Sequence, residues 1–181
     1  MLIAGWRGAA DLRRIGSGHT GATNTMRAAG WPAGVAVAVL DAAKGVAAVW
    51  LGFQFGAEWL VPLAGASVVA GQCWPPMRRW GGGMGVATAA GCMLAGWPLG
   101  LVLAVGLDSL LTLLLRHAAR ANVISGLLVA PLFWLAGAEP MQVGLSLAVG
   151  LVVALRAQKD WRRHYTELWL DRASERSEAE R

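Results

Sequence analysis

The sequence predicts an all-α integral membrane protein, a polytopic helix bundle with about six transmembrane segments. Composition is the first reason: 56% of the 181 residues are hydrophobic, only 15% are charged, and the mean hydropathy is +0.48. Soluble domains carry roughly 25% charged residues. The second reason is that apolar residues form long runs, and the third is that charges collect between them. We expect one membrane-embedded domain over residues 1–160 and a cytoplasmic tail, interfacial or solvated, over 161–181.

Six apolar runs define the expected spans. Because a membrane segment must satisfy its own backbone hydrogen bonds, each run is expected to be a helix. Several are shorter than the ~20 residues of a full span. The shortest ends at Trp97-Pro98, and we expect a tilted or broken helix there, or half of a hairpin. The runs cover residues 31–53, 57–73, 85–97, 99–115, 121–136 and 140–155.

The charged residues between the runs predict the orientation. If the N-terminal segment lies inside, alternation places every Lys and Arg except Lys44 on that side, and only Glu58 and Glu139 on the other. This is the positive-inside pattern, and it places both termini and the glycine-rich loops in the cytoplasm. The net charge of +5 is attributed to loops facing anionic membrane lipid, so no nucleic-acid partner is expected.

Three charged residues lie within the expected spans. Asp41 and Lys44 are three positions apart, so they share one helix face and can pair. A lone charge at mid-bilayer costs roughly 3 kcal/mol. We therefore expect the pair to face the bundle interior or a polar cavity, with an ion pair that only fixes packing as the alternative. Asp108 has no local partner and is expected near Arg116 or facing a polar interior.

The chain changes character after residue 155. Four residues repeat at helical spacing and predict an amphipathic C-terminal helix at the membrane interface: Trp161, Tyr165, Leu168 and Trp169. The last residues, 171–181, are charge-mixed and expected to be solvated. Cys73 and Cys92 lie in apolar surroundings without metal-ligand spacing, so we expect packing residues and no metal site.

A polar, glycine-rich stretch, Ile15 to Arg27, precedes the first apolar run. Its glycines let backbone N–H groups converge on one point. Ser17 and Thr23 add hydroxyl groups, and Arg27 adds a planar cation. This composition suits an anion, most simply a phosphate. The alternative is a glycine-rich connection ahead of a helix.

A second glycine-rich stretch runs from Gly71 to Thr88. Gly81, Gly82, Gly83 and Gly85 stand just before an apolar run. Backbone amides there can contribute to an anion site at a helix N-terminus. A flexible cytoplasmic turn is the alternative. Both glycine-rich stretches fall on one side of the membrane, so a shared site is expected.

Four motifs, in order, resemble those of the acyl-phosphate-dependent glycerol-3-phosphate acyltransferases, the PlsY type. Ser17-Gly-His-Thr-Gly-Ala-Thr-Asn-Thr-Met-Arg27 resembles S-G-N-x-G-A-T-N-x-x-R. Asp41-Ala-Ala-Lys-Gly45 resembles D-x-x-K-G, and Arg116-His117 resembles an internal R-Y segment. Gly71 to Thr88 aligns without gaps to G-H-x-F-P-x-F-x-x-F-K-G-G-K-G-V-A-T. The resemblance extends from about Gly5 to Arg163.

The resemblance implies a multi-pass enzyme of phospholipid biosynthesis in the bacterial inner membrane. Such an enzyme moves a fatty acyl group from acyl phosphate to the 1-hydroxyl of glycerol 3-phosphate, giving lysophosphatidic acid, without a cofactor. Ser17 and Arg27 are then the expected catalytic residues. The expected substrate-binding residues are Gly18, His19, Gly21, Thr23, Asn24, Lys44, Gln72, Gly82, Gly83 and Gly85.

The chain departs from the family pattern at several positions. His19 stands for an Asn, Gln72 for a His, and Gly81 and Met84 for two lysines. In an R-H-x-x-N-type motif beginning at Arg156, the His and Asn positions hold Ala157 and Asp160. Six spans stand where the family has seven, which a late start assignment or a truncation would explain.

These departures leave alternatives open. A neutral Gly81 or Met84 cannot supply the point charge of a lysine beside a phosphate. A catalytically weakened or inactive paralogue that binds lipid phosphate or a membrane partner is therefore the main alternative. A small transporter, suggested by Asp41, Lys44 and Asp108, ranks last because the polar loops lie on one face.

Overall fold

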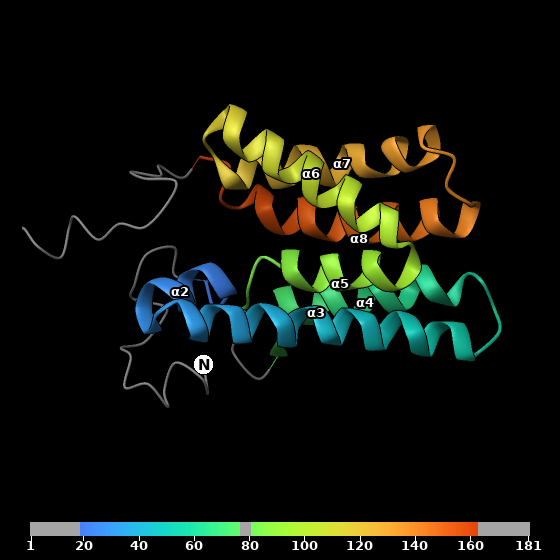
Figure 1. Ribbon diagram of the computed structural model, residues 1–181, viewed down its shortest axis with the longest axis horizontal. Helices are drawn as coiled ribbons and strands as arrows, with labels where there is room; N and C mark the ends of the chain where they lie inside the picture. Colours follow the sequence, from blue (N-terminus) through green and yellow to red (C-terminus); the bar gives the residue numbers. More distant parts are fainter. Residues whose placement is uncertain (1–18, 77–80, 163–181) are drawn as a thin grey trace, which may run out of the picture.

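The fold is a bundle of α-helices. In the computed structural model, residues 19–76 and 81–162 are described, and they form seven helices (Figure 1). The helices are α2 (Ala22–Ala29), α3 (Trp31–Gln54), α4 (Leu60–Cys73), α5 (Val86–Gly96), α6 (Pro98–Leu115), α7 (Ala118–Leu135) and α8 (Pro140–Gln158). All six apolar runs are therefore helical. The amphipathic helix expected after Trp161 lies outside the described residues.

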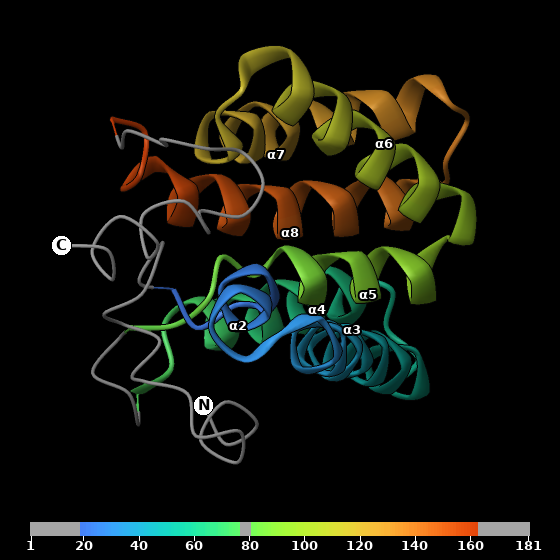
Figure 2. The same ribbon diagram turned by 60° about the vertical axis from the view of Figure 1, so that its left-hand side comes forward.

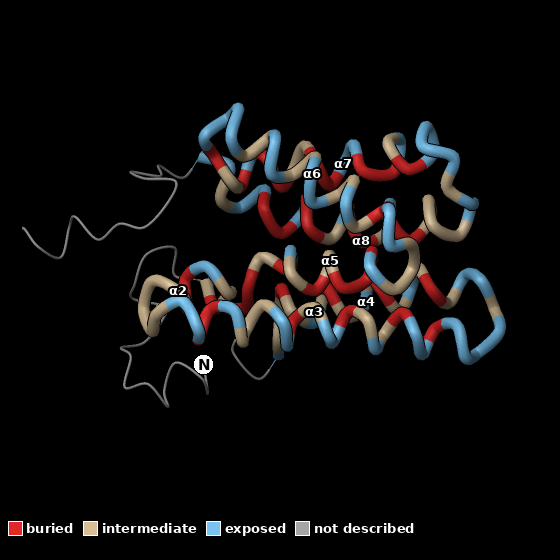
Figure 3. The backbone as a smooth tube through the Cα atoms, viewed as in Figure 1, coloured by how far each residue is buried: buried red, intermediate tan, exposed pale blue. Residues whose placement is uncertain are grey.

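The helices pack in two tiers. Helices α2 to α5 form one tier and α6 to α8 the other, with their buried faces turned toward each other (Figures 1 and 3). Helix α8 joins the tiers because it packs against α4 and α5 as well as α7. The core at this junction includes Val69, Cys92, Phe133, Leu145 and Val149.

Helix length and exposure fit a membrane protein. Four described helices, α3, α6, α7 and α8, are long and apolar enough to cross a membrane, whereas α4 and α5 have only 14 and 11 residues. Only 6% of the apolar window of α6 is buried within the protein, and most of its leucines and valines, such as Val102 and Leu114, are exposed. Apolar side chains exposed in such numbers require lipid around them.

The break expected at Trp97-Pro98 separates α5 from α6. Trp97 is extended, with φ −163° and ψ 106°, and α6 starts at Pro98. Proline suits the first turn of a helix because the missing N–H has no partner there. The Trp97 ring meets Phe133 edge to face, with ring centroids 5.1 Å apart. The chain therefore turns at Trp97, and α5 is a separate short helix that does not continue into α6.

Glycines set the closest helix crossings. A Cβ on Gly45 would overlap backbone atoms of Thr88 and Cys92, and one on Gly91 would overlap Ala42, so α3 and α5 meet backbone to backbone. Gly126 and Gly150 make an equivalent crossing between α7 and α8. Small residues at crossings are how membrane helices gain packing energy.

Two ends of the bundle differ in charge. The start of α2, the 81–85 loop, the α6–α7 turn and the end of α8 lie at one end (left in Figures 1 and 2). Arg116 and Arg156 belong to that end. The α3–α4 and α7–α8 turns, which carry Glu58 and Glu139, lie at the other. The two glycine-rich stretches thus share one end of the molecule.

Candidate active site

The first glycine-rich stretch is only partly a loop. From Ala22 onward it is helix α2, and Gly30, at φ 89°, ends that helix. Residues 1–18 are outside the described part, so Ser17 and Gly18 are not placed. The rest of the loop is tied to α2: Asn24 Nδ2 donates to the His19 carbonyl at 2.9 Å, and Thr25 Oγ1 donates to the Gly21 carbonyl at 3.0 Å.

Helix α2 presents one cation without a described partner. Within residues 19–76 and 81–162, the Nε of Arg27 is buried and makes no hydrogen bond. A buried guanidinium donor without an acceptor is costly. A substrate oxygen is the natural acceptor for it. Thr23 points to the surface, and Asn24 is buried.

The second glycine-rich stretch is held by close backbone packing. A Cβ on Gly82 would overlap the Gln72 carbonyl oxygen and lie 2.6 Å from that of Cys73. Gly85 is left-handed, at φ 80°, and caps α5, and its Cβ would lie 2.7 Å from Cys73 Sγ. The Gly83 N–H donates to the Gln72 carbonyl at 3.2 Å, so it is occupied in this structure.

The two stretches meet. A Cβ on Gly83 would lie 3.7 Å from the Cα of Gly21, which is ordinary van der Waals contact. Among residues 19–76 and 81–162, no atom lies within 4 Å of a Cβ placed on Gly21. The two stretches are therefore adjacent, as a shared site would require, and whether they bind an anion together stays a prediction.

A polar triad lies beside the second stretch. Lys44 Nζ donates to Asp41 Oδ1 at 2.6 Å, as the helical spacing predicts. Gln72 then joins both residues: its Nε2 donates to Asp41 Oδ2 at 2.8 Å and its Oε1 accepts from Lys44 at 3.1 Å. The sequence did not predict the Gln72 contact, because it joins α3 to α4 across about thirty positions. The ammonium of Lys44 remains half exposed.

A second polar cluster joins the first stretch to α8. His19 Nε2 lies 2.7 Å from Asp160 Oδ2, and Arg156 Nη2 lies 3.1 Å from His19 Nδ1. Arg156 Nη1 is 3.8 Å from Asp160. From the sequence, His19 was expected to bind substrate, and Asp160 differed from the family pattern without an expected contact. The shared departure at both positions was the available signal for their contact.

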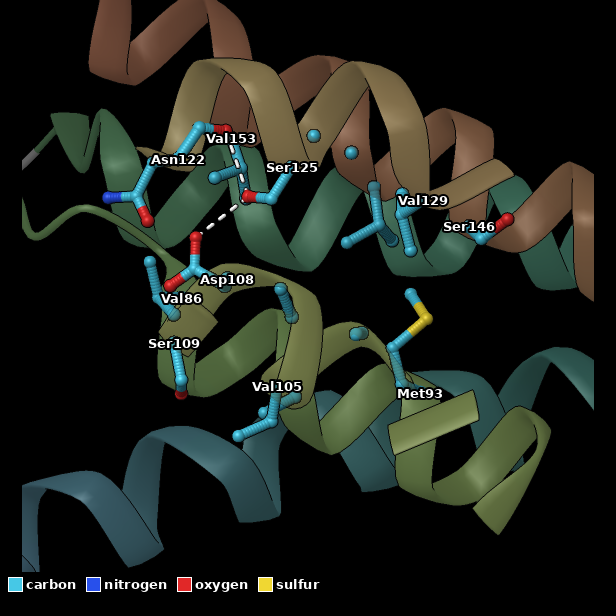
Figure 4. A pocket seen from close by; sticks show the side chains of 16 residues that line it. Val86, Met93, Val105, Asp108, Ser109, Asn122, Ser125, Val129, Ser146 and Val153 are labelled. Atoms are coloured by element: carbon cyan, nitrogen blue, oxygen red, sulfur yellow. Dashed lines mark hydrogen bonds between the residues drawn. The ribbon is translucent and has the colours of Figure 1, made fainter. Parts of the chain in front are cut away.

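An open cavity of about 240 Å³ lies between α5, α6, α7 and α8 (Figure 4). Its walls are mostly apolar, including Val86, Met93 and Val129. Asp108 lines it and accepts a hydrogen bond from Ser125 Oγ at 2.7 Å. Asp108 therefore faces the interior of the bundle, where Ser125 is its hydrogen-bond partner in a mostly apolar cavity.

The apolar bundle and its outward-facing apolar helices define an integral membrane protein, with two adjacent glycine-rich stretches at one end. A family model of glycerol-3-phosphate acyltransferases matches residues 1–167. The chain therefore belongs to the glycerol-3-phosphate acyltransferase family.

Individual relatives support this family assignment. Glycerol-3-phosphate acyltransferase of Dinoroseobacter shibae is 38% identical over 162 residues, covering 88% of this chain and 78% of the relative. That of Synechococcus sp. (strain CC9902) is 36% identical over 157 residues, covering 86% and 78%. That of Escherichia coli O1:K1 / APEC is 35% identical over 176 residues, covering 93% and 84%.

Two solved structures share the fold. The glycerol 3-phosphate form of PlsY (YgiH), an integral membrane glycerol 3-phosphate acyltransferase, has a TM-score of 0.77 and 28% identity, covering 90% of this chain and 82% of the other. Its lysophosphatidic acid form has a TM-score of 0.71 and 26% identity, covering 81% and 76%. The all-α integral membrane fold expected from the sequence is confirmed.

Proposed function

We propose that this glycerol-3-phosphate acyltransferase takes its acyl group from an acyl phosphate. The 1-hydroxyl oxygen of glycerol 3-phosphate bonds to the acyl carbon, the acyl–phosphate C–O bond breaks, and lysophosphatidic acid and inorganic phosphate leave. The observation that carries the proposal is the meeting of Gly21 and Gly83 at one end of a chain whose family match spans residues 1–167. The inactive-paralogue alternative is not favoured by the comparisons.

Acyl phosphate is an activated donor, so catalysis can rest on positioning and on charge stabilisation without a protein nucleophile. The proposed phosphate cradle consists of Ser17, Gly18, Gly21 and the Gly82–Gly85 turn. Arg27 offers a buried donor with no described acceptor, and Lys44 offers a half-exposed ammonium. These two cations are the proposed partners of glycerol 3-phosphate, with His19, Thr23, Asn24 and Gln72 around them.

The neutral Gly81 and Met84 are the largest departure at this site. Among the described cations, Arg27 lies on α2 at the end of the first stretch, and Lys44 on α3 contacts Gln72 of the second stretch. Arg78 and Arg79 lie outside the described residues. We propose that the Lys44 ammonium, held by Asp41 and Gln72 beside the second stretch, supplies part of the charge that the family's lysines supply.

The cavity between α5 and α8 suits the acyl chain. Val86, the first residue of α5, lines it and directly follows Gly85 of the phosphate turn. An acyl phosphate whose headgroup occupies the turn can therefore extend its chain along an apolar wall into the bilayer-facing part of the bundle. Burying each methylene contributes about 0.8 kcal/mol.

We further propose that the protein lies in the bacterial inner membrane with its site in the cytoplasm. Arginines at the loop end and Glu58 and Glu139 at the opposite end support this orientation. Residues 1–160 would form the membrane-embedded domain and 161–181 a cytoplasmic tail.

One experiment tests these proposals together. Labelled glycerol 3-phosphate and acyl phosphate are added to right-side-out and inverted membrane vesicles that contain the wild type, Arg27→Lys or Arg27→Ala. We expect product only with inverted vesicles, and a drop in kcat of about 10²–10³ for Arg27→Ala, because one charge-assisted contact to a developing anion is lost. Arg27→Lys keeps the charge but not the planar fork and should fall between.

Folded wild-type protein that forms no lysophosphatidic acid would contradict the proposed donor. Turnover with acyl-CoA in place of acyl phosphate would correct it. Equal activity in both vesicle orientations would argue against a cytoplasmic site.

A further inference from the structure

Two departures from the family pattern touch each other in this chain. His19 and Asp160 are 141 positions apart, yet His19 Nε2 and Asp160 Oδ2 are 2.7 Å apart. Their side chains are only 16% and 14% exposed. If only one of the two positions departed from the family pattern, the His19 ring or the Asp160 carboxylate would be largely buried without the other as its hydrogen-bond partner. The two together form a short hydrogen bond.

Arg156 fixes the proton arrangement of this contact. A guanidinium has donors and no acceptor. Because Arg156 Nη2 lies 3.1 Å from His19 Nδ1, that nitrogen accepts, and the imidazole proton is on Nε2, which donates to Asp160. Both ring nitrogens are thus engaged by the protein. His19 is not poised to take a proton from a substrate hydroxyl.

The cluster of His19, Arg156 and Asp160 connects the segment before Gly21, helix α2 and the C-terminal end of α8. His19 precedes Gly21 and α2, and its carbonyl accepts from Asn24 on α2. Arg156 and Asp160 stand at the C-terminal end of α8, and the Arg156 side chain is 8% exposed. A buried arginine needs a carboxylate partner, which Asp160 supplies. The ring therefore holds the first glycine-rich stretch against α8 from one side while α2 holds it from the other.

We propose that His19 and Asp160 are a matched pair of positioning residues, which fixes the segment from His19 to Gly21 at the end of α8 so that the Gly21 backbone is presented to acyl phosphate. This inference rests on the proposed function. It assigns no proton transfer to His19 and no substrate contact to Asp160. A misplacement of about 1 Å in a positioning group can lower the rate about 10²-fold. The His19–Asp160 hydrogen bond can therefore affect the rate without contacting the substrate.

A double-mutant cycle tests the pair. The variants are His19→Ala, Asp160→Ala and the double variant, assayed in inverted vesicles and, after purification, for thermal unfolding in detergent. His19→Gln is the conservative variant, because its amide Nε2 can donate from nearly the place of the imidazole Nε2. Lys159→Ala is the matched control, since Lys159 is an exposed charged neighbour outside the cluster.

We expect each alanine variant to lower kcat/KM about tenfold or more and the double variant to lose no more than the worse single one. His19→Gln should retain activity within about threefold of wild type, and Lys159→Ala should match wild type. The loss should appear mainly as a higher KM for acyl phosphate. The KM for glycerol 3-phosphate should change less, because Arg27 is carried by α2, which packs on α3.

Losses that multiply in the double variant would overturn the inference, and so would a His19→Gln variant as impaired as His19→Ala, which would point to proton transfer by the imidazole. If the alanine variants do not fold, Asp160→Asn with His19→Gln completes the same cycle with smaller changes. A folded wild type without turnover overturns the proposed function itself. Wild-type turnover with multiplicative losses overturns only the pairing.

Discussion

The two glycine-rich stretches hold their shape by different physical means. In the second, the 81–85 segment is fixed by backbone packing: Gly82 and Gly85 leave no room for a Cβ, and Gly83 donates to the Gln72 carbonyl. The first has open space at Gly21 and is held by the His19 ring and the Asn24 side chain. One stretch depends on the absence of side chains, and the other depends on their presence.

This difference limits how individual positions of each stretch can change. Side-chain contacts can be exchanged as a pair, as His19 and Asp160 indicate. Backbone contacts offer no such exchange, since any Cβ at Gly82 meets a carbonyl oxygen that cannot move alone. We therefore expect substitutions in the second stretch to cost more than matched substitutions in the first.

The largest effect is expected for Gly82→Ala. The new methyl would overlap the Gln72 carbonyl oxygen and displace the turn, which should lower kcat/KM about 10²-fold. Gly71→Ala is the matched control, since no atom of the described part of the chain lies within 4 Å of a Cβ there. That variant should keep its activity and gain about 0.5–1 kcal/mol of helix stability. Kinetics in vesicles and thermal unfolding of both proteins check the pair. Full activity of Gly82→Ala would show that the second stretch is adaptable.

A smaller effect is expected for Gln72→Leu. The change removes hydrogen bonds to Asp41 and Lys44 and leaves the Lys44 ammonium less well placed. A hydrogen bond to a charged group contributes about 1.5–3 kcal/mol, so we expect a loss of about tenfold in kcat/KM for glycerol 3-phosphate. Gln72→His, which restores the residue of the family pattern, should remain near wild type. If Gln72→Leu had no effect on kinetics, the triad would serve packing alone.

The smallest effect is expected for Gly21→Ala. Its φ is −93°, which any residue adopts, and a Cβ would meet no atom of the described residues within 4 Å. We expect almost unchanged thermal unfolding, because the main structural cost is a poorer helix N-cap. We expect a loss of about threefold in kcat/KM, because the methyl enters the space proposed for the phosphate. A loss as large as that of Gly82→Ala with unchanged unfolding would contradict the ranking, because it would mean that bound phosphate leaves no room for a methyl beside Gly21.

Much of the fold could be predicted from the sequence. The six apolar runs became helices within a few residues of the expected bounds, and Trp97-Pro98 marked a real boundary. The stretch from Ile15 to Arg27 was less predictable: its second half is helix α2, which the loop reading missed. Glycine and hydroxyl residues lower helix propensity, but packing of α2 on Gly34 of α3 overrides it.

The candidate site was predictable as a location and not as a set of contacts. Charge alternation placed both glycine-rich stretches at one end, and Gly21 and Gly83 do meet there. The Asp41–Lys44 pair followed from helical spacing. The third member of that triad, Gln72, did not, because spacing along one helix carries no information about the neighbouring helix.

The sequence by itself therefore determined the membrane class, the helices, the polar end and the family, since composition, periodicity and motifs are local properties. Only the tertiary structure decided which polar groups pair: His19 with Asp160, Gln72 with Asp41, and Asp108 with Ser125. Those pairings depend on how far the helices approach and how they are rotated about their axes. Backbone contacts at Gly45, Gly91, Gly126 and Gly150 set that approach, and they exist only when the helices have packed.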